Sequence, residues 1–394
     1  LGRGMAPRAE AYTWNFNINS NGLSMQEEMD ISQYKYGITL TQNSYGRYIA
    51  QICSLYKELI NQQSDYELDI LTNEIPTLTH VFSAGNDQGA CFTATEEAWG
   101  VINYGLSSRR AKNIINVGAV DEQGRMTSFS SWGPQDDGRV FPTICAKGQA
   151  VYSVQALGGY TRENGTSMAC PTVTGHLALL QERYKQIHNG EEIRNDLLRA
   201  IVANTADDAG RQHVDFQFGY GIMNAEHAVV AIEKKWWYTD KISNGETAKP
   251  VKINVPVGTK SLRVMMAWND PPAQKLYKYG ESIMLNDLDL EVKVGNKTFL
   301  PWVLNTEKGK VEEVATRKPD RLNNMEQVTL DLSELNGVTE VEILVKGQRV
   351  VNGLQPYAVT YYLEEDKNPR IVWPNAGDVL EPGTLYRAIL EGIT

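Results

Sequence analysis

The sequence lacks several features that would indicate particular classes of protein. Its 38 Lys and Arg are outnumbered by 48 Asp and Glu, and a net charge of −10 leaves no basic surplus for nucleic-acid phosphates. No apolar run approaches the roughly 18 residues that a membrane-spanning helix needs. The four cysteines, at positions 53, 91, 145 and 170, form no C-x-x-C pair. This spacing excludes a zinc knuckle or a thioredoxin-type motif and leaves three possible disulfide pairings, of which Cys91 with Cys145 is one candidate.

The first part of the chain alternates short apolar runs with helical patterns. Hydrophobic residues make up 42% and charged residues 22%, which is typical of globular proteins, and 394 residues favour two to four domains. The alternation predicts an α/β fold with a largely parallel sheet and helices on both faces. The expected strands are 9–16, 37–41, 78–83 and 113–120, and the expected helices are 47–60, 166–187, 195–206 and 225–233. The first half of 166–187 is nearly all small or apolar and should be buried, whereas 195–206 and 225–233 should be amphipathic.

The pattern changes near residue 238. Short alternating segments separated by turn-forming residues predict an all-β sandwich with no long helix. The expected strands are 251–255, 261–268, 289–294, 328–332, 339–345 and 357–363. We therefore expect one domain over 1–237, a second over 238–365, and the start of an appended β domain over 366–394.

Residues 164–171 (NGTSMACP) open the apolar helix and carry the strongest chemical signal. A serine at a helix N-terminus lies beside free backbone N–H groups and the positive end of the helix dipole. These groups can stabilise the oxyanion that forms when the hydroxyl attacks a carbonyl. Taken alone, the segment also fits an ordinary N-capping Ser or Thr. The G-x-S-x-G motif of α/β-hydrolases is absent, because Ala169 occupies the place of its second Gly.

This segment resembles the nucleophile motif of the subtilisin-like serine peptidases, Gly-Thr-Ser-Met-Ala-x-Pro. The resemblance implies that Ser167 is the nucleophile and that Asn86, in the segment FSAGN at 82–86, donates the second oxyanion hydrogen bond. An isolated Ser-Ala-Gly-Asn would otherwise indicate a plain turn. The segment 43–46 is similar to the family's substrate-binding edge, where the backbone pairs with an extended peptide. The substrate-binding residues implied are Ser44, Tyr45, Gly46, Ser83, Ala84, Gly85, Gly165 and Thr166.

The second half extends the resemblance to subtilases that carry a C-terminal jelly-roll β-sandwich. The segments concerned are 266–272, 285–290 and 320–326, so the resemblance covers roughly residues 1–365. Clustered oxygen ligands suit calcium, and Asp270, Asp287 and Asp289 are candidate ligands, although turn chemistry favours solvated loop acids over a metal site. No cofactor is expected for the chemistry itself.

One departure from the family pattern concerns the catalytic base. Neither Asp-Thr-Gly nor Asp-Ser-Gly nor His-Gly-Thr-His occurs, and residues 1–10 resemble the segment that follows the family's catalytic His helix. His80, on an apolar strand, and His176, in the buried helix, fit core or surface roles better than that of a base. We expect the triad His and Asp to come from an N-terminal segment of the same precursor.

The resemblance implies a secreted, periplasmic or cell-surface serine endopeptidase that hydrolyses extended peptides or proteins through an acyl-enzyme on Ser167. Without the His and Asp, this chain alone should be nearly inactive. A protein of another class also fits the absent dyad: an inactive peptidase-like protein that uses its β-sandwich for binding or surface attachment. Nucleic acid is not an expected partner.

Overall fold

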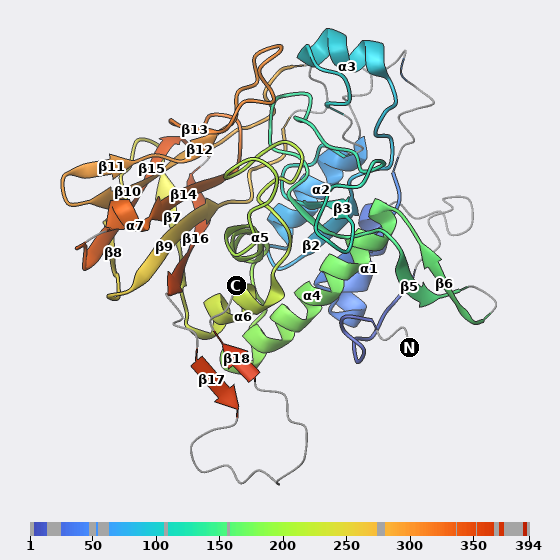
Figure 1. The fold of residues 1–394 in the computed structure, drawn as a ribbon, viewed down its shortest axis with the longest axis horizontal. Coiled ribbons are helices and arrows are strands. Elements are labelled where there is room, and N and C mark those ends of the chain that lie inside the picture. Colours follow the sequence, from blue (N-terminus) through green and yellow to red (C-terminus); the bar gives the residue numbers. More distant parts are fainter. Residues whose placement is uncertain are drawn as a thin grey trace.

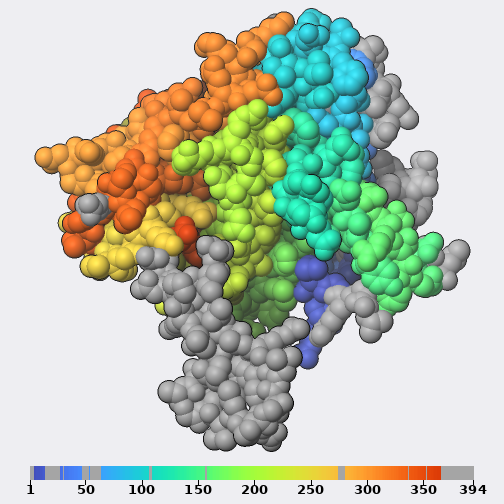
Figure 2. All heavy atoms as spheres, viewed as in Figure 1, coloured from blue at the N-terminus to red at the C-terminus, as the bar shows by residue number. Residues whose placement is uncertain are grey.

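The computed structural model arranges the chain as an α/β part and an antiparallel β part that lie side by side (Figure 1). In the space-filling view, the orange surface of the β part continues directly into the cyan surface of the α/β part (Figure 2). The structure describes residues 4–13, 25–46, 53, 63–105, 109–155, 158–273, 280–335, 337–351, 353–365, 370–373 and 389–391.

A four-stranded parallel sheet forms the centre of the α/β part. Its strands follow the order β1-β2-β3-β4, with every described neighbour parallel. Every residue of β2 and β3 is buried, as expected for strands covered on both faces. The sheet confirms the predicted α/β class, although the first strand begins three residues later than expected. The bounds are β1 Leu40–Asn43, β2 Thr79–Ser83, β3 Ile115–Val120 and β4 Ile144–Lys147.

Three of the predicted helices are observed. α4 (Thr166–Ile187) has the predicted bounds, as does α6 (Ala225–Glu233), and α5 (Asn195–Asn204) ends two residues early. No prediction covered the remaining elements of this part, the helices α1 Met25–Tyr36, α2 Gln63–Glu74 and α3 Phe92–Trp99 and the antiparallel hairpin of β5 Val151–Val154 with β6 Tyr160–Glu163.

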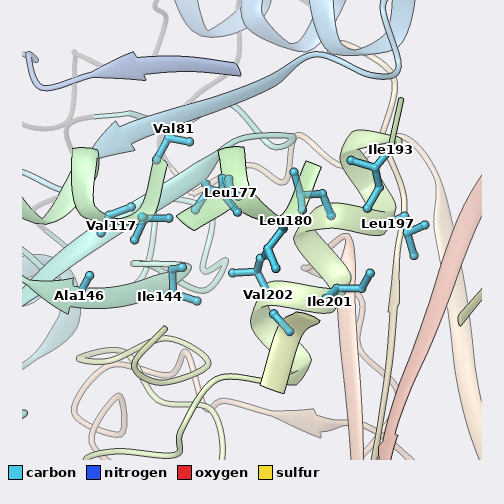
Figure 3. Close-up of a cluster of buried hydrophobic side chains, with 14 of the residues drawn as sticks. Val81, Val117, Ile144, Ala146, Leu177, Leu180, Ile193, Leu197, Ile201 and Val202 are labelled. Carbon is cyan, nitrogen blue, oxygen red and sulfur yellow. The ribbon is translucent and has the colours of Figure 1, made fainter. Parts of the chain in front are cut away.

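The core of the α/β part lies between the sheet and α4. Val81, Val117 and Ile144 extend from three neighbouring strands toward Leu177 and Leu180 of α4, and all five side chains are buried (Figure 3). Burying a side chain of this size stabilises a fold by about 1.5–3 kcal/mol. This packing fixes the position of α4, and hence of its N-terminus, relative to the carboxyl ends of the strands.

The predicted strand 9–16 is not observed over its described residues, 9–13. These residues form no strand, and no described strand pairs with them. An apolar extended segment needs a hydrogen-bonding neighbour to become part of a sheet, and the periodicity that predicted it cannot supply one. Residues 14–16 and the predicted helix 47–60, apart from Cys53, lie outside the described residues.

The antiparallel part contains two four-stranded sheets, ordered β11-β10-β15-β8 and β14-β9-β16-β7. Side chains of both sheets enclose one hydrophobic cluster, which includes Val264, Leu290, Ile343 and Val359. All six predicted strands are present with shifted ends, and β7 occupies the predicted domain break. The bounds are β7 Trp237–Ser243, β8 Val251–Asn254, β9 Thr259–Ala267, β10 Asp287–Val294, β11 Lys297–Phe299, β14 Met325–Asp331, β15 Glu340–Arg349 and β16 Leu354–Glu365. The short elements are β12 Trp302–Val303, β13 Thr316–Arg317, α7 Leu332–Leu335, β17 Arg370–Trp373 and β18 Ile389–Glu391.

α5 connects the two parts. One side of the helix, including Leu197 and Ile201, belongs to the core beneath the parallel sheet, and the other side, including Ala200 and Ala203, packs with Met265 of β9. All ten residues of α5 are buried. The predicted amphipathic helix is thus present, and its polar residues are buried against protein as well.

A buried ion pair also joins the two parts. The Lys112 ammonium, which precedes β3, contacts an Asp270 carboxylate oxygen, and both side chains are fully buried. Lys112 Nζ also donates to the carbonyls of Pro271 and Ile283. The Asp270 carboxylate accepts the N–H groups of Leu285 and Asn286 at 3.0 and 2.7 Å. Both charges are thus almost fully hydrogen-bonded, as burial requires.

Candidate active site

Ser167 lies in the first turn of α4. In space, this turn lies beside the residues that follow the carboxyl ends of β1 and β2. Thr166 is the first residue of the helix and Gly165 precedes it. Ser167 is half-buried, whereas Gly165 and Thr166 are buried. Packing against the sheet therefore leaves the predicted nucleophile partly accessible at the start of the helix.

Asn86 follows β2 and lies against the same helix start. Its Oδ1 accepts the Thr166 N–H at 2.9 Å and the Thr166 hydroxyl at 2.9 Å. These two bonds fix the amide plane and direct Nδ2 away from Thr166. A Cβ atom built on Gly165 would lie 3.4 Å from Nδ2, so the absence of a side chain at Gly165 keeps this approach open. The arrangement presents an N–H donor close to the Ser167 N–H, as an oxyanion site requires.

The loop that carries Asn86 is held on both sides. The Gly85 N–H donates to Thr166 Oγ1 at 3.1 Å, and the Gly85 carbonyl accepts the Ser131 N–H at 2.9 Å. Gly85 has φ 113°, and a Cβ there would lie 3.0 Å from Ser131 Oγ. A residue with a side chain would therefore be strained and crowded at this position.

Ser44 and Ser167 are joined by two reciprocal contacts. The Ser44 hydroxyl donates to the Ser167 carbonyl at 2.7 Å, and the Ser167 hydroxyl donates to the Ser44 carbonyl at 3.4 Å. The first is a normal hydrogen bond, whereas the second lies at the limit of one. The structure thus places the predicted substrate-binding segment directly beside the predicted nucleophile.

Tyr45 is anchored beneath this segment. Its hydroxyl donates to Asn43 Oδ1 at 2.9 Å, and its ring meets the Phe82 ring edge-on at 6.0 Å. The Arg109 guanidinium lies 4.9 Å from the centre of the Phe82 ring and 5.9 Å from that of Tyr45. Burial raises the pKa of Tyr45, so the phenol stays protonated at neutral pH. The ring forms a fixed wall next to Ser44.

The remaining predicted substrate-binding residues lie around this centre. Gly46 is exposed at the end of the described segment, whereas Ser83 and Ala84 are buried at the end of β2. The Ala84 N–H donates to the Val117 carbonyl at 3.0 Å, which continues the sheet as far as Gly85. Ser83 and Ala84 therefore form the floor of the site rather than its rim.

The structure describes all five histidines, and none of them is hydrogen-bonded to Ser167. His80 is buried on β2, where its Nδ1 lies 2.7 Å from Thr41 Oγ1 and burial lowers its pKa to about 4. Burial also lowers the pKa of His176 in α4. His188, His213 and His227 contact the rings of Tyr184, Trp302 and Tyr362. The contacts of Ser167 therefore include no general base from the described part of this chain.

The three candidate metal ligands are paired with cations of the chain itself. Asp270 binds Lys112 as described above, and Asp287 and Asp289 both contact Arg321. Burial raises the pKa of Asp287 to about 6 in spite of Arg321. No group of three or more His, Cys, Asp or Glu side chains among the described residues is arranged to hold a metal ion.

Sequence reasoning missed two features of the site. Gln42 contacts the Ser44 hydroxyl, and a disulfide joins Cys53 to Cys91. The Cys91–Cys145 pairing is therefore wrong, and Cys145 and Cys170 are free and buried. The disulfide connects the chain that follows Gly46 to the loop that follows Asn86. Side chains alternate between the two faces of a strand, so residues 40, 42 and 44 share one face. This alternation could have indicated that Gln42 lies beside Ser44.

A serine at a helix start, beside an oriented amide, is an arrangement that can stabilise an oxyanion. Comparisons with known proteins show the family of the chain. Residues 1–221, more than half of the chain, match the Peptidase S8 subtilase family. The chain belongs to the subtilase family. None of the described helices has the length and apolar character needed to cross a membrane.

Curated relatives match shorter stretches. Alkaline elastase YaB of Bacillus sp. is 34% identical over 152 residues, which cover 39% of this chain and 36% of that protein. Subtilisin DY of Bacillus licheniformis is 36% identical over 116 residues, covering 29% and 37%. C5a peptidase of Streptococcus pyogenes serotype M6 is 29% identical over 172 residues, covering 42% and 14%. The matched stretches thus span 14% to 37% of these relatives' lengths.

Among solved structures, the patellamide maturation protease PatA superposes with a TM-score of 0.40 at 19% identity, covering 54% of this chain and 70% of that chain. The self-cleaved protease domain of PatA gives a TM-score of 0.39 at 18% identity and covers 56% and 72%.

Proposed function

We propose that this protein is a serine endopeptidase that cleaves peptide bonds through an acyl-enzyme on Ser167. The observation that carries the proposal is the orientation of Asn86, whose Oδ1 is occupied by both Thr166 donors. Its Nδ2 is therefore turned away from Thr166 and toward the space beside Gly165, where a Cβ atom would lie 3.4 Å from it. A core helix needs no such donor beside an accessible serine, whereas an oxyanion site does.

In the proposed reaction, Ser167 Oγ attacks the peptide carbonyl carbon and the carbonyl oxygen becomes an oxyanion. The Ser167 N–H and the Asn86 Nδ2–H hold that oxygen. A base must accept the hydroxyl proton and then deliver it to the leaving amine as the C–N bond breaks. Water, activated by the same base, then hydrolyses the ester and releases Ser167. A histidine from an N-terminal segment of the same precursor would act as that base, and an aspartate of the same segment would orient it.

The outer edge of β1 supports a partner of this kind. β1 pairs with β2 on one side, and no described strand pairs with its other side. An open edge of a parallel sheet leaves backbone N–H and C=O groups without strand partners. A further parallel strand added here would end beside Ser44, within reach of the α4 N-terminus. The proposed N-terminal segment would thus complete both the sheet and the catalytic residues.

The substrate would be an extended peptide that adds to the segment 44–46. Main-chain hydrogen bonding of an extended peptide to an exposed edge provides affinity, while neighbouring pockets provide side-chain preference. The relatives named as elastase, subtilisin and C5a peptidase support a peptide or protein substrate.

We further propose that the antiparallel part over 238–365 is a jelly-roll domain, and that the protein is secreted, periplasmic or cell-surface. The two sheets with one shared core support the first proposal. The Cys53–Cys91 disulfide supports the second, because such bonds form and persist in oxidising compartments.

A second candidate is an inactive peptidase-like protein that binds a ligand through its antiparallel part. The observation that favours it is the set of histidine contacts, none of which involves Ser167 in the described part of the chain. The oriented Asn86 amide argues against it, because binding through the other part would not need that orientation.

The test compares the verified single chain with the chain assembled with its N-terminal segment. A fluorophosphonate probe should label Ser167 only in the assembled form, because the hydroxyl needs a base to lose its proton. Ser167→Ala in the assembled form serves as the matched control and should abolish both labelling and peptide hydrolysis. Full peptidase activity of the single chain, or labelling at another serine, would overturn the assignment. An assembled form that is neither labelled nor active would favour the binding protein.

A further inference from the structure

Pro171 removes one hydrogen bond from the first turns of α4. In an α-helix, the N–H of residue 171 would donate to the carbonyl of residue 167, but proline has no N–H. The carbonyl of the predicted nucleophile therefore lacks its helical donor. A carbonyl in this position needs another partner, because an unpaired buried polar group is costly.

The Ser44 hydroxyl replaces the missing donor. It donates to the Ser167 carbonyl at 2.7 Å, across from β1 to α4. A hydroxyl has one proton, so this bond depends on the direction in which that proton points. Any neighbour that demanded the same proton would remove the bond.

Gln42, an exposed residue of β1, contacts the same hydroxyl. Its Nε2 donates to Ser44 Oγ and also lies 3.6 Å from Cys170 Sγ in α4. Because the amide N–H occupies Ser44 Oγ as an acceptor, the hydroxyl proton is left to point at Ser167. Gln42, Ser44 and Ser167 thus form a directed chain in which each group donates to the next.

We propose that Gln42 is a positioning residue for the nucleophile, acting through the Ser44 hydroxyl on the Ser167 carbonyl; this rests on the proposed function. This series of hydrogen bonds holds the Ser167 carbonyl with a bond of normal length. The Ser167 hydroxyl has only the 3.4 Å contact to the Ser44 carbonyl. The backbone, and with it the oxyanion N–H, is therefore fixed. The hydroxyl can turn toward a base at little cost, because the contact that it gives up is weak.

The experiment uses the assembled enzyme and replaces the hydrogen-bond donor at residue 42 by an acceptor. Gln42→Glu keeps the size of the side chain, but its carboxylate accepts a proton from Ser44 instead of donating one. The Ser44 hydroxyl then turns away from Ser167, as if Ser44 had been replaced by Ala. Gln42→Glu and Ser44→Ala should each lower kcat about three- to tenfold, the usual worth of one neutral hydrogen bond. Both variants should leave KM within about twofold.

A double variant separates this role from a general structural one. If Gln42 acts through Ser44, then Gln42→Glu should cost nothing further once Ser44 is Ala. Ser44→Thr, which retains a hydroxyl, should restore most of the activity. Pro171→Ala, which supplies the missing N–H, should reduce the cost of Ser44→Ala. The proposal would be overturned if the effects of Gln42→Glu and Ser44→Ala on kcat multiply in the double variant. An unchanged kcat in both single variants would also overturn it.

Thr39→Val is the matched control. Thr39 Oγ1 donates to Gln181 Oε1 at 3.0 Å, which is also a side-chain bond to α4 but lies 14 residues beyond Ser167. This variant should leave kcat unchanged, because the contact lies about four helical turns from the nucleophile.

A readout that needs no catalysis keeps the test valid if the assembled wild type is inactive. Deuterium exchange of residues 164–173 should be faster in Gln42→Glu and in Ser44→Ala than in the wild type, because the first turn of α4 opens more easily. Exchange in Thr39→Val should match the wild type. An inactive wild type would refute the proposed function alone, whereas unchanged exchange in both variants would refute the role of Gln42.

Discussion

Replacing Lys112 by Met should destabilise the whole protein strongly, because this change removes the cation from a buried pair. The Lys112 and Asp270 side chains are both fully buried. After the substitution, Asp270 keeps the N–H groups of Leu285 and Asn286 but loses its counter-charge. The carbonyls of Pro271 and Ile283 lose their donor at the same time.

The expected loss is about 3–5 kcal/mol, the usual cost of leaving one buried charge without its partner. An exposed pair provides the comparison: Lys252 and Glu340 are 2.7 Å apart, with side chains 60% and 42% exposed. Lys252→Met should therefore cost no more than about 1 kcal/mol. The double variant Lys112→Met with Asp270→Asn should lose less than the sum of its single changes, because Asn still accepts an N–H and carries no charge.

Urea unfolding, followed by tryptophan fluorescence, measures these free energies in the whole chain. Because the pair joins residues of the α/β part and of the antiparallel part, both parts should become less stable together. A loss for Lys112→Met no larger than that for Lys252→Met would refute the reasoning. So would a loss confined to an early transition that leaves the second part as stable as before.

Three further predictions concern the site and its surroundings. Asn86→Leu should lower kcat of the assembled enzyme about 10²–10³-fold, the usual cost of one oxyanion donor, and a loss below tenfold would contradict its role. Burial lowers the pKa of His80 to about 4 in the folded protein. As the pH falls, the unfolded chain, in which histidine titrates near pH 6.5, therefore binds the proton before the folded protein does. Its contribution to stability should be complete above about pH 6.5 and fall by about 3 kcal/mol toward pH 4; a His80→Asn variant with the same pH dependence would contradict this. Because Arg321 and Lys112 already pair with the candidate calcium ligands, a chelator should leave the melting temperature unchanged, and a fall would favour a calcium site.

The parts of the fold that were predictable from sequence are those with strong local signals. α4 has the predicted bounds because a glycine precedes it, an apolar run continues through it and a polar segment follows it. Ser167 and Asn86 were predicted from a resemblance to short family motifs, and the structure places Asn86 against Thr166, the residue before Ser167. Local chemistry determines such features, so a single sequence can reveal them.

The other features depend on partners that are distant in sequence. Residues 9–13 have a strand-like pattern but form no strand, because pairing rather than periodicity makes a sheet. The Ser44 hydroxyl is the donor to the Ser167 carbonyl in place of an N–H that Pro171, more than a hundred residues away, does not have. The partner of Cys91 was equally open until the structure placed Cys53 beside it. Sequence reasoning could not pair residues that lie so far apart along the chain.

α5 shows that the family match and the packed core around it need not end at the same residue. The family match stops at residue 221, but the outer side of α5 is covered by β9 and β16, which come later in the chain. A relative without an antiparallel part would expose that side to water, and selection would then favour polar residues where this chain has Ala200 and Ala203. The composition of this one helix, read across the family, should therefore report which members carry such a companion domain.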